Sequence, residues 1–339
     1  MPRLPGRTLA LTTFLALVVT LISSTAVAQY QMINLTCNLT GKAKHTDPLL
    51  KNPWGLVYAP GGPFWVNDEA SGWSTLYDGM GNPQSLQVTI PPASGTGPGT
   101  PTGIVYNGSQ EFAIDTWVSV FLFATLDGTI SGWSSFSPTE ALIGATNPGA
   151  SYTGLAITNK ASGNFLFAAD AANNKVDIYD GNFNLVSSFT DAEVPAGFAP
   201  FGIQDINGDV FVSYAATSGG PGGFIDIFSE AGVLVKRFAH GAPLKQPWGF
   251  AVAPANFGKL SDTLLVTNNV TEGTINAFDL KTGKLVGTMQ NSEGKDIAIN
   301  GLWGIEFGGG SSSNGQKNQL FFTAGPNDLD GFFGVIFAK

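Results

Sequence analysis

Residues 153–189 read TGLAITNKASGNFLFAADAANNKVDIYDGNFNLVSSF, and this stretch decides the fold of the 339-residue chain. It contains four short apolar or alternating runs, separated by segments rich in Gly, Asn and Asp. Runs of this length bounded by turn residues are typical of β-strands joined by tight turns. The first two runs are almost continuously apolar, as in strands buried on both faces, whereas the third alternates. The stretch therefore predicts one four-stranded antiparallel sheet.

The same pattern, a glycine followed at once by a short apolar strand, recurs along the chain. The repeat glycines are Gly55, Gly103, Gly154, Gly202, Gly249 and Gly304. Their spacings of 48, 51, 48, 47 and 55 residues are typical of propeller blades, which are supersecondary units that bury their faces only against neighbouring units. We predict an all-β, six-bladed β-propeller with four antiparallel strands in each blade.

The two ends of the chain indicate how the ring closes. The last blade, over residues 302–337, has only three predicted strands, and residues 30–39 alternate in the manner of a strand. We expect this N-terminal strand to complete the last blade, because that pairing leaves no exposed edge at the seam. Cys37, the only cysteine, is then a small packed residue of the closing strand and forms no intrachain disulfide.

The N-terminal segment has the order of features of a secretory signal. Arg3 and Arg7 precede an apolar run over residues 9–22, and Ala26-Val27-Ala28 provides a small-residue cleavage site. We predict a signal peptide over residues 1–28 and a single propeller domain over residues 29–339. The protein is then expected to be a monomer that is secreted or held in the periplasm or cell envelope. No later stretch is long and apolar enough to span a bilayer.

Composition excludes several classes of function. The formal net charge is −9, which argues against nucleic acid or anionic membranes as partners because both need a basic patch. The two histidines, His45 and His240, are too few for a three-histidine zinc site. Neither stands near a nucleophile-elbow pattern, and no phosphate-binding loop follows a predicted strand.

Aromatic side chains gather at one predicted end of the central channel. The residue before the repeat glycine is aromatic in four of six blades, and these four residues are Trp54, Phe201, Trp248 and Trp303. Together they would offer stacking surfaces for a sugar or another small organic ligand. The alternative is that they only fill the channel, which is common in this architecture.

Oxygen-bearing side chains follow several second strands near the same end. Asn67, Asp68, Asp170 and Asn268 are the hard ligands that Ca²⁺ prefers, so a calcium-assisted hydrolase or lactonase is a second hypothesis. Six-bladed lactonases of the gluconolactonase kind usually carry a ligand residue directly before the repeat glycine, where this chain has Trp, Thr or Phe. The alternative is that these Asn and Asp residues cap turns.

The blade pattern resembles a known class of propellers. The segments FLFAAD at 165–170 and KVDIY at 175–179 resemble NHL-type repeats. Other segments resemble a family of secreted bacterial propeller proteins of uncharacterised function, and they are NPWG at 52–55, APFGIQ at 199–204, QPWG at 246–249, TINAFD at 274–279, GLWG at 301–304 and LFFTAGP at 320–326. Some members of that family carry a C-terminal exosortase sorting tail, whereas this sequence reaches Lys339 directly after its last strand.

The chain also departs from that family at two places. Residues 267–273 read TNNVTEG where a glycine-rich segment is usual, and Asp330 stands where a His is common. The resemblance implies the fold and export. We expect an exported scaffold that recognises a small ligand or a protein partner at the mouth of its channel. The alternatives are the calcium-dependent hydrolase and a structural protein of the envelope or matrix.

Overall fold

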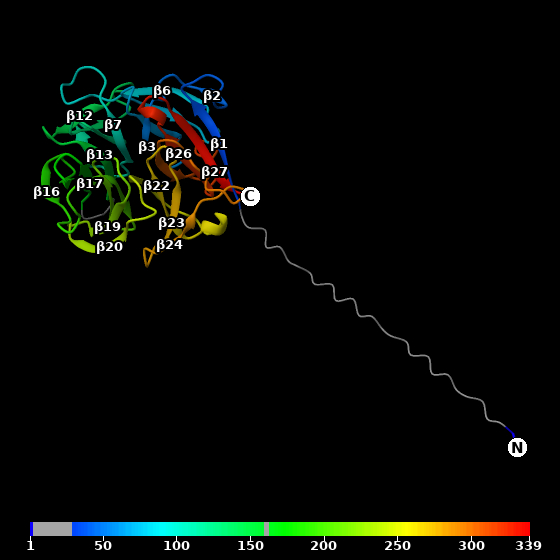
Figure 1. The fold of residues 1–339 in the computed structure, drawn as a ribbon. Coiled ribbons are helices and arrows are strands. Elements are labelled where there is room, and N and C mark those ends of the chain that lie inside the picture. The colour runs from blue at the N-terminus through cyan, green and yellow to red at the C-terminus, as the bar shows by residue number, and fades with distance from the viewer. Residues whose placement is uncertain (3–28, 159–162) are drawn as a thin grey trace.

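The computed structural model describes residues 1–2, 29–158 and 163–339. The predicted signal peptide lies almost wholly outside the described residues. Six small sheets stand around a central axis like the blades of a propeller (Figure 1), which confirms the predicted all-β fold. No helix among the described residues has the length and apolarity needed to cross a membrane.

Five blades contain four antiparallel strands each, and the inner strand of each contains the repeat glycine. Blade 1 holds β3 (Pro53–Tyr58), β4 (Phe64–Asp68), β5 (Trp73–Tyr77) and β6 (Pro83–Thr89). Blade 2 holds β7 (Pro101–Tyr106), β10 (Phe121–Thr125), β11 (Thr129–Trp133) and β12 (Leu142–Thr146), with a small hairpin of β8 (Ala113–Ile114) and β9 (Trp117–Val118) inserted after its first strand.

The next three blades repeat this order. Blade 3 holds β13 (Tyr152–Ile157), β14 (Leu166–Asp170), β15 (Lys175–Tyr179) and β16 (Leu185–Phe189). Blade 4 holds β17 (Phe198–Ile206), β18 (Asp209–Ala216), β19 (Gly223–Ser229) and β20 (Leu234–His240). Blade 5 holds β21 (Pro247–Val252), β22 (Thr263–Asn268), β23 (Ile275–Asp279) and β24 (Leu285–Thr288), with a short 3-10 helix η1 (Gly258–Leu260).

Blade 6 is closed by the N-terminal strand, as predicted. Its strands are β25 (Leu302–Phe307), β26 (Gln319–Ala324) and β27 (Phe332–Ala338), with the 3-10 helix η2 (Pro326–Asp328) between the last two. β1 (Tyr30–Cys37) pairs antiparallel with β27, from Tyr30 opposite Ala338 to Cys37 opposite Phe332. The two strands lie side by side in blue and red in Figure 1. The short β2 (His45–Thr46) adds a parallel fifth strand.

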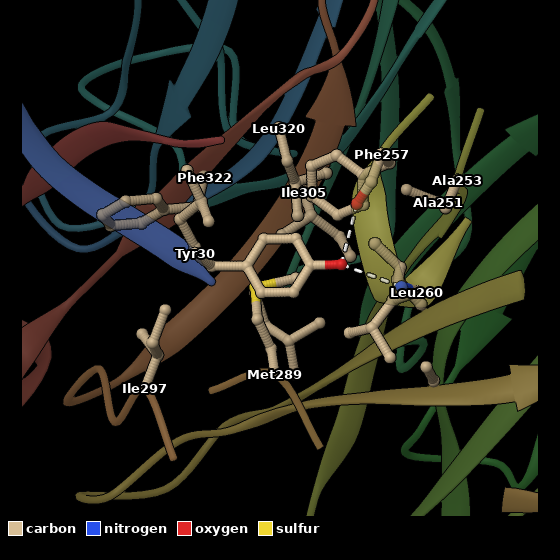
Figure 2. Close-up of a cluster of buried hydrophobic side chains, with 14 of the residues drawn as sticks. Tyr30, Ala251, Ala253, Phe257, Leu260, Met289, Ile297, Ile305, Leu320 and Phe322 are labelled. Carbon is tan, nitrogen blue, oxygen red and sulfur yellow. Dashed lines mark hydrogen bonds between the residues drawn. The ribbon is translucent and has the colours of Figure 1, made fainter. Parts of the chain in front are cut away.

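Tyr30 anchors the start of the closing strand to the neighbouring blade. Its hydroxyl donates to the Phe257 carbonyl at 2.7 Å and accepts from the Leu260 backbone N–H at 2.9 Å. Figure 2 shows the ring among apolar side chains of blades 5 and 6, including Met289 and Phe322. At the other end of β1, Cys37 is buried and unpaired, as the sequence predicted. The seam is thus held by both backbone pairing and side-chain packing.

The repeat glycines allow neighbouring inner strands to approach each other around the channel. A Cβ added at Gly55 would lie 2.7 Å from the Thr102 carbonyl oxygen, and one at Gly304 would lie 2.7 Å from that of Trp54. At Gly202 the added atom would overlap the Trp248 carbonyl. None of these glycines has a positive φ. The glycine is therefore needed for close approach, and its conformational freedom is not the reason for the repeat.

A ring of side-chain hydrogen bonds joins each blade to the next. One polar residue per blade donates to a carbonyl at the start of the next inner strand, and the donors are Asn67, Thr102, Thr153, Ser213, Thr267 and Thr323. In blades 1, 4, 5 and 6 the donor lies on the second strand. In blades 2 and 3 the second strand has Ala124 or Ala169 at that position, and the Thr before the glycine is the donor instead.

Candidate functional site

The four aromatic residues predicted as stacking surfaces pack against one another. The rings of Trp54 and Trp303 stack with centroids 3.6 Å apart, and Trp248 meets both edge-on at 6.1 and 5.7 Å. Phe201 lies 6.1 Å from Trp54 and 5.6 Å from Trp303. The three tryptophans are 3 to 8% exposed. They form an aromatic plug that fills the channel where the inner strands begin.

Hydrogen bonds hold two rings of the plug in place. The Trp248 Nε1–H donates to the Thr153 carbonyl at 2.9 Å, and the Trp303 Nε1–H donates to Asn52 Oδ1 at 3.0 Å. The Trp54 Nε1–H is buried and has no hydrogen-bond partner among the described residues. The four rings therefore contact one another at this end of the channel, and the three indoles are buried.

Asn67 and Asp68, two of the proposed calcium ligands, are fully buried in blade 1. The Asn67 amide donates to the carbonyls of Thr102 and Gly103, so it belongs to the ring of inter-blade bonds. Asp68 accepts a 2.7 Å hydrogen bond from the Thr75 hydroxyl. Burial raises the pKa of Asp68 well above its usual value, and the nearby charge of Asp47 raises it further.

Asp170 and Asn268, the other two proposed ligands, lie in blades 3 and 5. Asp170 accepts hydrogen bonds from the backbone of Ser151 and from the side chain of Asn173. Asn268 accepts from Lys245 N and donates to the Pro243 carbonyl at 2.8 Å. The four residues thus stand in separate networks of three blades. Over the described ranges, no three His, Cys, Asp or Glu side chains gather closely enough to hold a metal ion.

A cavity of about 350 Å³ occupies the channel beyond the plug. The inner strands of the blades line it, running from the repeat glycines toward the opposite mouth, and Trp248 belongs both to the plug and to the cavity wall. Most of the wall is apolar, and it includes Leu56, Val57, Ile104, Leu155, Ile203 and Ile305. The open part of the channel is therefore at the end where the inner strands finish, opposite the end that the sequence indicated.

Polar groups lie toward the far end of this cavity. They are Tyr58, Tyr106, Gln204, Asp205 and Glu306. Loss of hydration raises the pKa of Glu306 to about 7, against a smaller lowering by the Phe307 backbone amide. Burial, together with the charge of Glu306, raises the pKa of Tyr58 to about 12. Glu306 and Tyr58 come from adjacent blades and face the same channel.

No cation among the described residues forms an ion pair with Glu306. Of the described residues that line the cavity, two are carboxylates and none is Lys, Arg or His. A desolvated carboxylate without a counter-charge is costly. Carboxylates held under such conditions are typical of functional sites.

Sequence reasoning missed these residues, although a signal exists. The second residue after the repeat glycine is Val57, Val105, Ala156 and Ala251 in four blades, but Gln204 and Glu306 in the other two. A polar residue at a repeat position that is apolar in the other blades marks a polar place in the wall of the channel. The residue before the glycine is aromatic in four blades, and the structure places those four side chains in the plug.

Sequence comparison finds relatives among viral proteins. The uncharacterised protein R648 of Acanthamoeba polyphaga mimivirus is 31% identical over an alignment that covers 92% of this chain and 81% of that protein. The uncharacterised protein L690 of the same virus is 29% identical over an alignment that covers 92% of this chain and 86% of that protein. No established family model matches the chain.

Solved structures with the same architecture include enzymes. A gluconolactonase from Xanthomonas campestris superposes with a TM-score of 0.58 and 13% identity, covering 91% of this chain and 90% of its own. A virginiamycin B lyase from Staphylococcus aureus gives a TM-score of 0.55 at 13% identity, covering 91% of this chain and 99% of its own. At such identity the likeness establishes the fold alone.

Proposed function

We propose that this chain, which belongs to the same family as the mimivirus protein R648, binds a small organic molecule in its central channel. The observation that carries the proposal is Glu306, a carboxylate with a pKa raised to about 7 that faces an open cavity and has no counter-charge among the described residues. A residue of this kind destabilises the empty protein. Its presence in the wall is explained if a ligand interacts with it.

The dimensions of the cavity support a small ligand. Its volume of about 350 Å³ lies near the lower end of the range of about 300–1,000 Å³ that is usual for small-molecule sites. An apolar cavity of about 150 Å³ is enough for benzene. The channel therefore has room for a molecule of one or two rings, with apolar walls along its sides and polar groups at one end.

A ligand screen with a blocked variant tests this proposal. One- and two-ring compounds of neutral, anionic and cationic character are screened by thermal shift and by ligand-observed NMR. Gln204→Trp fills the cavity from a half-buried position, whereas Gln316→Trp adds the same side chain at an exposed site outside it. We expect binding to wild type and Gln316→Trp, and none to Gln204→Trp. A screen without binders, or binders unaffected by Gln204→Trp, would contradict the proposal.

A hydrolase or lyase is the second candidate, and the pKa of about 7 at Glu306 favours it. A carboxylate with that pKa is suited to general acid–base chemistry near neutral pH. The calcium-dependent form of this hypothesis has less support, because Asn67, Asp170 and Asn268 each form hydrogen bonds in a separate network. Assays on lactones, with EDTA and with calcium, test it. Turnover that Glu306→Gln abolishes would promote this candidate over simple binding.

We also propose that the protein is exported, as its resemblance to secreted bacterial propeller proteins implies. Cleavage after Ala28 would leave Gln29 just before β1 begins at Tyr30, so the mature chain would retain the whole closing strand. Expression with the native N-terminus, followed by fractionation and mass spectrometry, tests this. A protein found in the cytoplasm with Met1 intact would contradict export, and with it a role as an envelope or matrix component.

A further inference from the structure

We propose that the ligand of the channel is an amphipathic organic cation, with its apolar body against the inner strands and its ammonium group beside Glu306 and Tyr58. This inference rests on the proposed binding function and names the chemical class of the ligand. The cavity itself supplies the argument. The negative charge and the aromatic groups of the wall favour the ammonium group of such a molecule. The apolar side walls favour its apolar body.

The charge of the wall selects against anions. Asp205 and Glu306 both line the cavity, and none of the other described residues of its wall is basic. An anionic ligand would be repelled by Glu306 and would meet no positive side chain in the described wall, and a neutral ligand would leave the carboxylate of Glu306 desolvated. A cation instead supplies the missing counter-charge, and charge-assisted hydrogen bonds to carboxylates are stronger than neutral ones.

The apolar depth of the channel selects against a small hydrated cation. The side walls are formed by aliphatic residues, and Trp248 contributes at the plug end. Water there has few hydrogen-bonding partners, so an apolar group that replaces it gains free energy. Tyr58 and Tyr106 add aromatic groups to the same wall, and aromatic faces attract ammonium groups within about 6 Å. The ligand is thus apolar at one end and positive at the other.

Few other titratable groups near Glu306 could make ligand binding depend on pH. The strands packed against β25 are β3, β21, β22 and β26, and Tyr58 of β3 is the only titratable residue among them. Asp205 is the other carboxylate of the cavity wall, and its Oδ1 accepts from the Gly208 backbone N–H at 3.3 Å. Because the Tyr58 pKa is about 12, it stays neutral. Cation binding is therefore expected to strengthen as Glu306 ionises.

Three compounds of similar shape test the charge class directly. These are 2-phenylethylamine, 2-phenylethanol and 3-phenylpropionate, titrated calorimetrically into the mature protein at pH 8.0 and 5.5. At pH 8.0 we expect the amine to bind at least tenfold more tightly than the alcohol and the carboxylate to show no binding. At pH 5.5 the preference for the amine should fall to threefold or less, since Glu306 is then mostly protonated.

Two variants locate the effect. Glu306→Gln should bind the alcohol as wild type does and lose the preference for the amine at pH 8.0. Glu272→Gln removes one negative charge at an exposed position outside the cavity wall and should keep the preference, which controls for net charge. If the alcohol binds as tightly as the amine and Gln204→Trp abolishes both, the cation class is wrong while channel binding stands. If neither they nor any screened compound binds, both proposals fail.

Discussion

At the scale of single residues, Glu306 and the repeat glycines have opposite effects on the stability of the fold. Glu306 has a folded-state pKa of about 7 against an ordinary value of 4.5, because the channel removes much of its hydration. The glycines have no side chain at all, because a neighbouring strand occupies that space. The first feature costs stability and the second is required for it.

The effect of Glu306 on stability depends on pH. Its pKa is raised in the folded state, so its contribution is fully present below about pH 4.5 and is lost as the pH rises through about 7. A shift from 4.5 to about 7 corresponds to at most about 3 kcal/mol. Glu306→Gln is therefore expected to be more stable than wild type at pH 8.5 and equally stable at pH 4.5. Urea melts at both values measure this, and a pH-independent difference would contradict it.

Gly202 tests the close approach of the inner strands. An added Cβ would overlap the Trp248 carbonyl of the next blade, so Gly202→Ala must push two strands apart and should cost about 3 kcal/mol or more. Gly287, in β24, also has an ordinary φ but meets nothing within 4 Å. Gly287→Ala is thus a matched control, and it should change the free energy of unfolding by less than about 1 kcal/mol. Equal effects of the two variants would show that approach is not the reason for the repeat.

At the scale of elements, each inner strand accepts a hydrogen bond from a side chain of the preceding blade. Thr267 shows the arrangement, since its hydroxyl donates to the Trp303 carbonyl at 2.7 Å and accepts from the Gly249 N–H at 2.8 Å. Thr323 does the same at the closing seam, toward Trp54 and Gly304. The contacts repeat around the whole ring, although the donor changes position between blades.

Thr267→Val should therefore destabilise the protein by about 2 kcal/mol or more, because it leaves a buried N–H and a buried carbonyl without that partner. Valine has nearly the shape of threonine, so packing changes little. Thr146 lies exposed on β12, and Thr146→Val should change stability by at most about 0.5 kcal/mol. Chemical denaturation of both variants measures the difference. A loss at Thr267 no larger than that at Thr146 would rule out the proposed role of the hydroxyl.

Blade 2 offers a test of whether the donor can change position. Thr102→Val removes the bond to the Tyr152 carbonyl and should be destabilising. Ala124 of the second strand occupies the position that Ser213 has in blade 4. Ala124→Ser in the Thr102→Val background should recover part of the loss, and a double-mutant cycle measures the coupling. Additive effects would mean that the two positions are not equivalent.

At the scale of the whole molecule, the ring depends on a pairing between two strands about 300 positions apart in the chain. β1 completes blade 6, and Tyr30 reaches blade 5 through two hydrogen bonds. Without β1, the backbone edge of β27 would be exposed, and exposed edges promote association with other chains.

A chain that begins at residue 39 tests this closure against one that begins at residue 29. We expect the shorter protein to lose several kcal/mol of stability and to form oligomers or aggregates. Thermal melts and size-exclusion chromatography measure the two effects. The control, which begins at residue 29, retains β1 and differs from the shorter chain only by residues 29–38. A shorter chain that melts like the control and elutes as a monomer would place the essential contacts elsewhere.

The amino-acid sequence was sufficient for the repeat, the number of blades and the strand that closes the ring. These features are visible in a sequence because turns, apolar runs and spacing are local properties of the chain. The importance of the aromatic residues before the glycines was also visible, but not whether they leave a cavity. That depends on how Trp54, Trp248 and Trp303 pack across the channel.

Only the tertiary structure decided which end of the channel is open and which polar groups face it. Glu306 and Tyr58 are 248 positions apart in the sequence and meet because blades 6 and 1 are neighbours in the closed ring. Likewise, the sequence offers four similar oxygen-bearing side chains as calcium ligands. Each of them forms hydrogen bonds with different partners in the folded chain, and they are Asn67, Asp68, Asp170 and Asn268. The chemistry of a site depends on such long-range contacts and on hydration, and neither is a property of a local stretch of sequence.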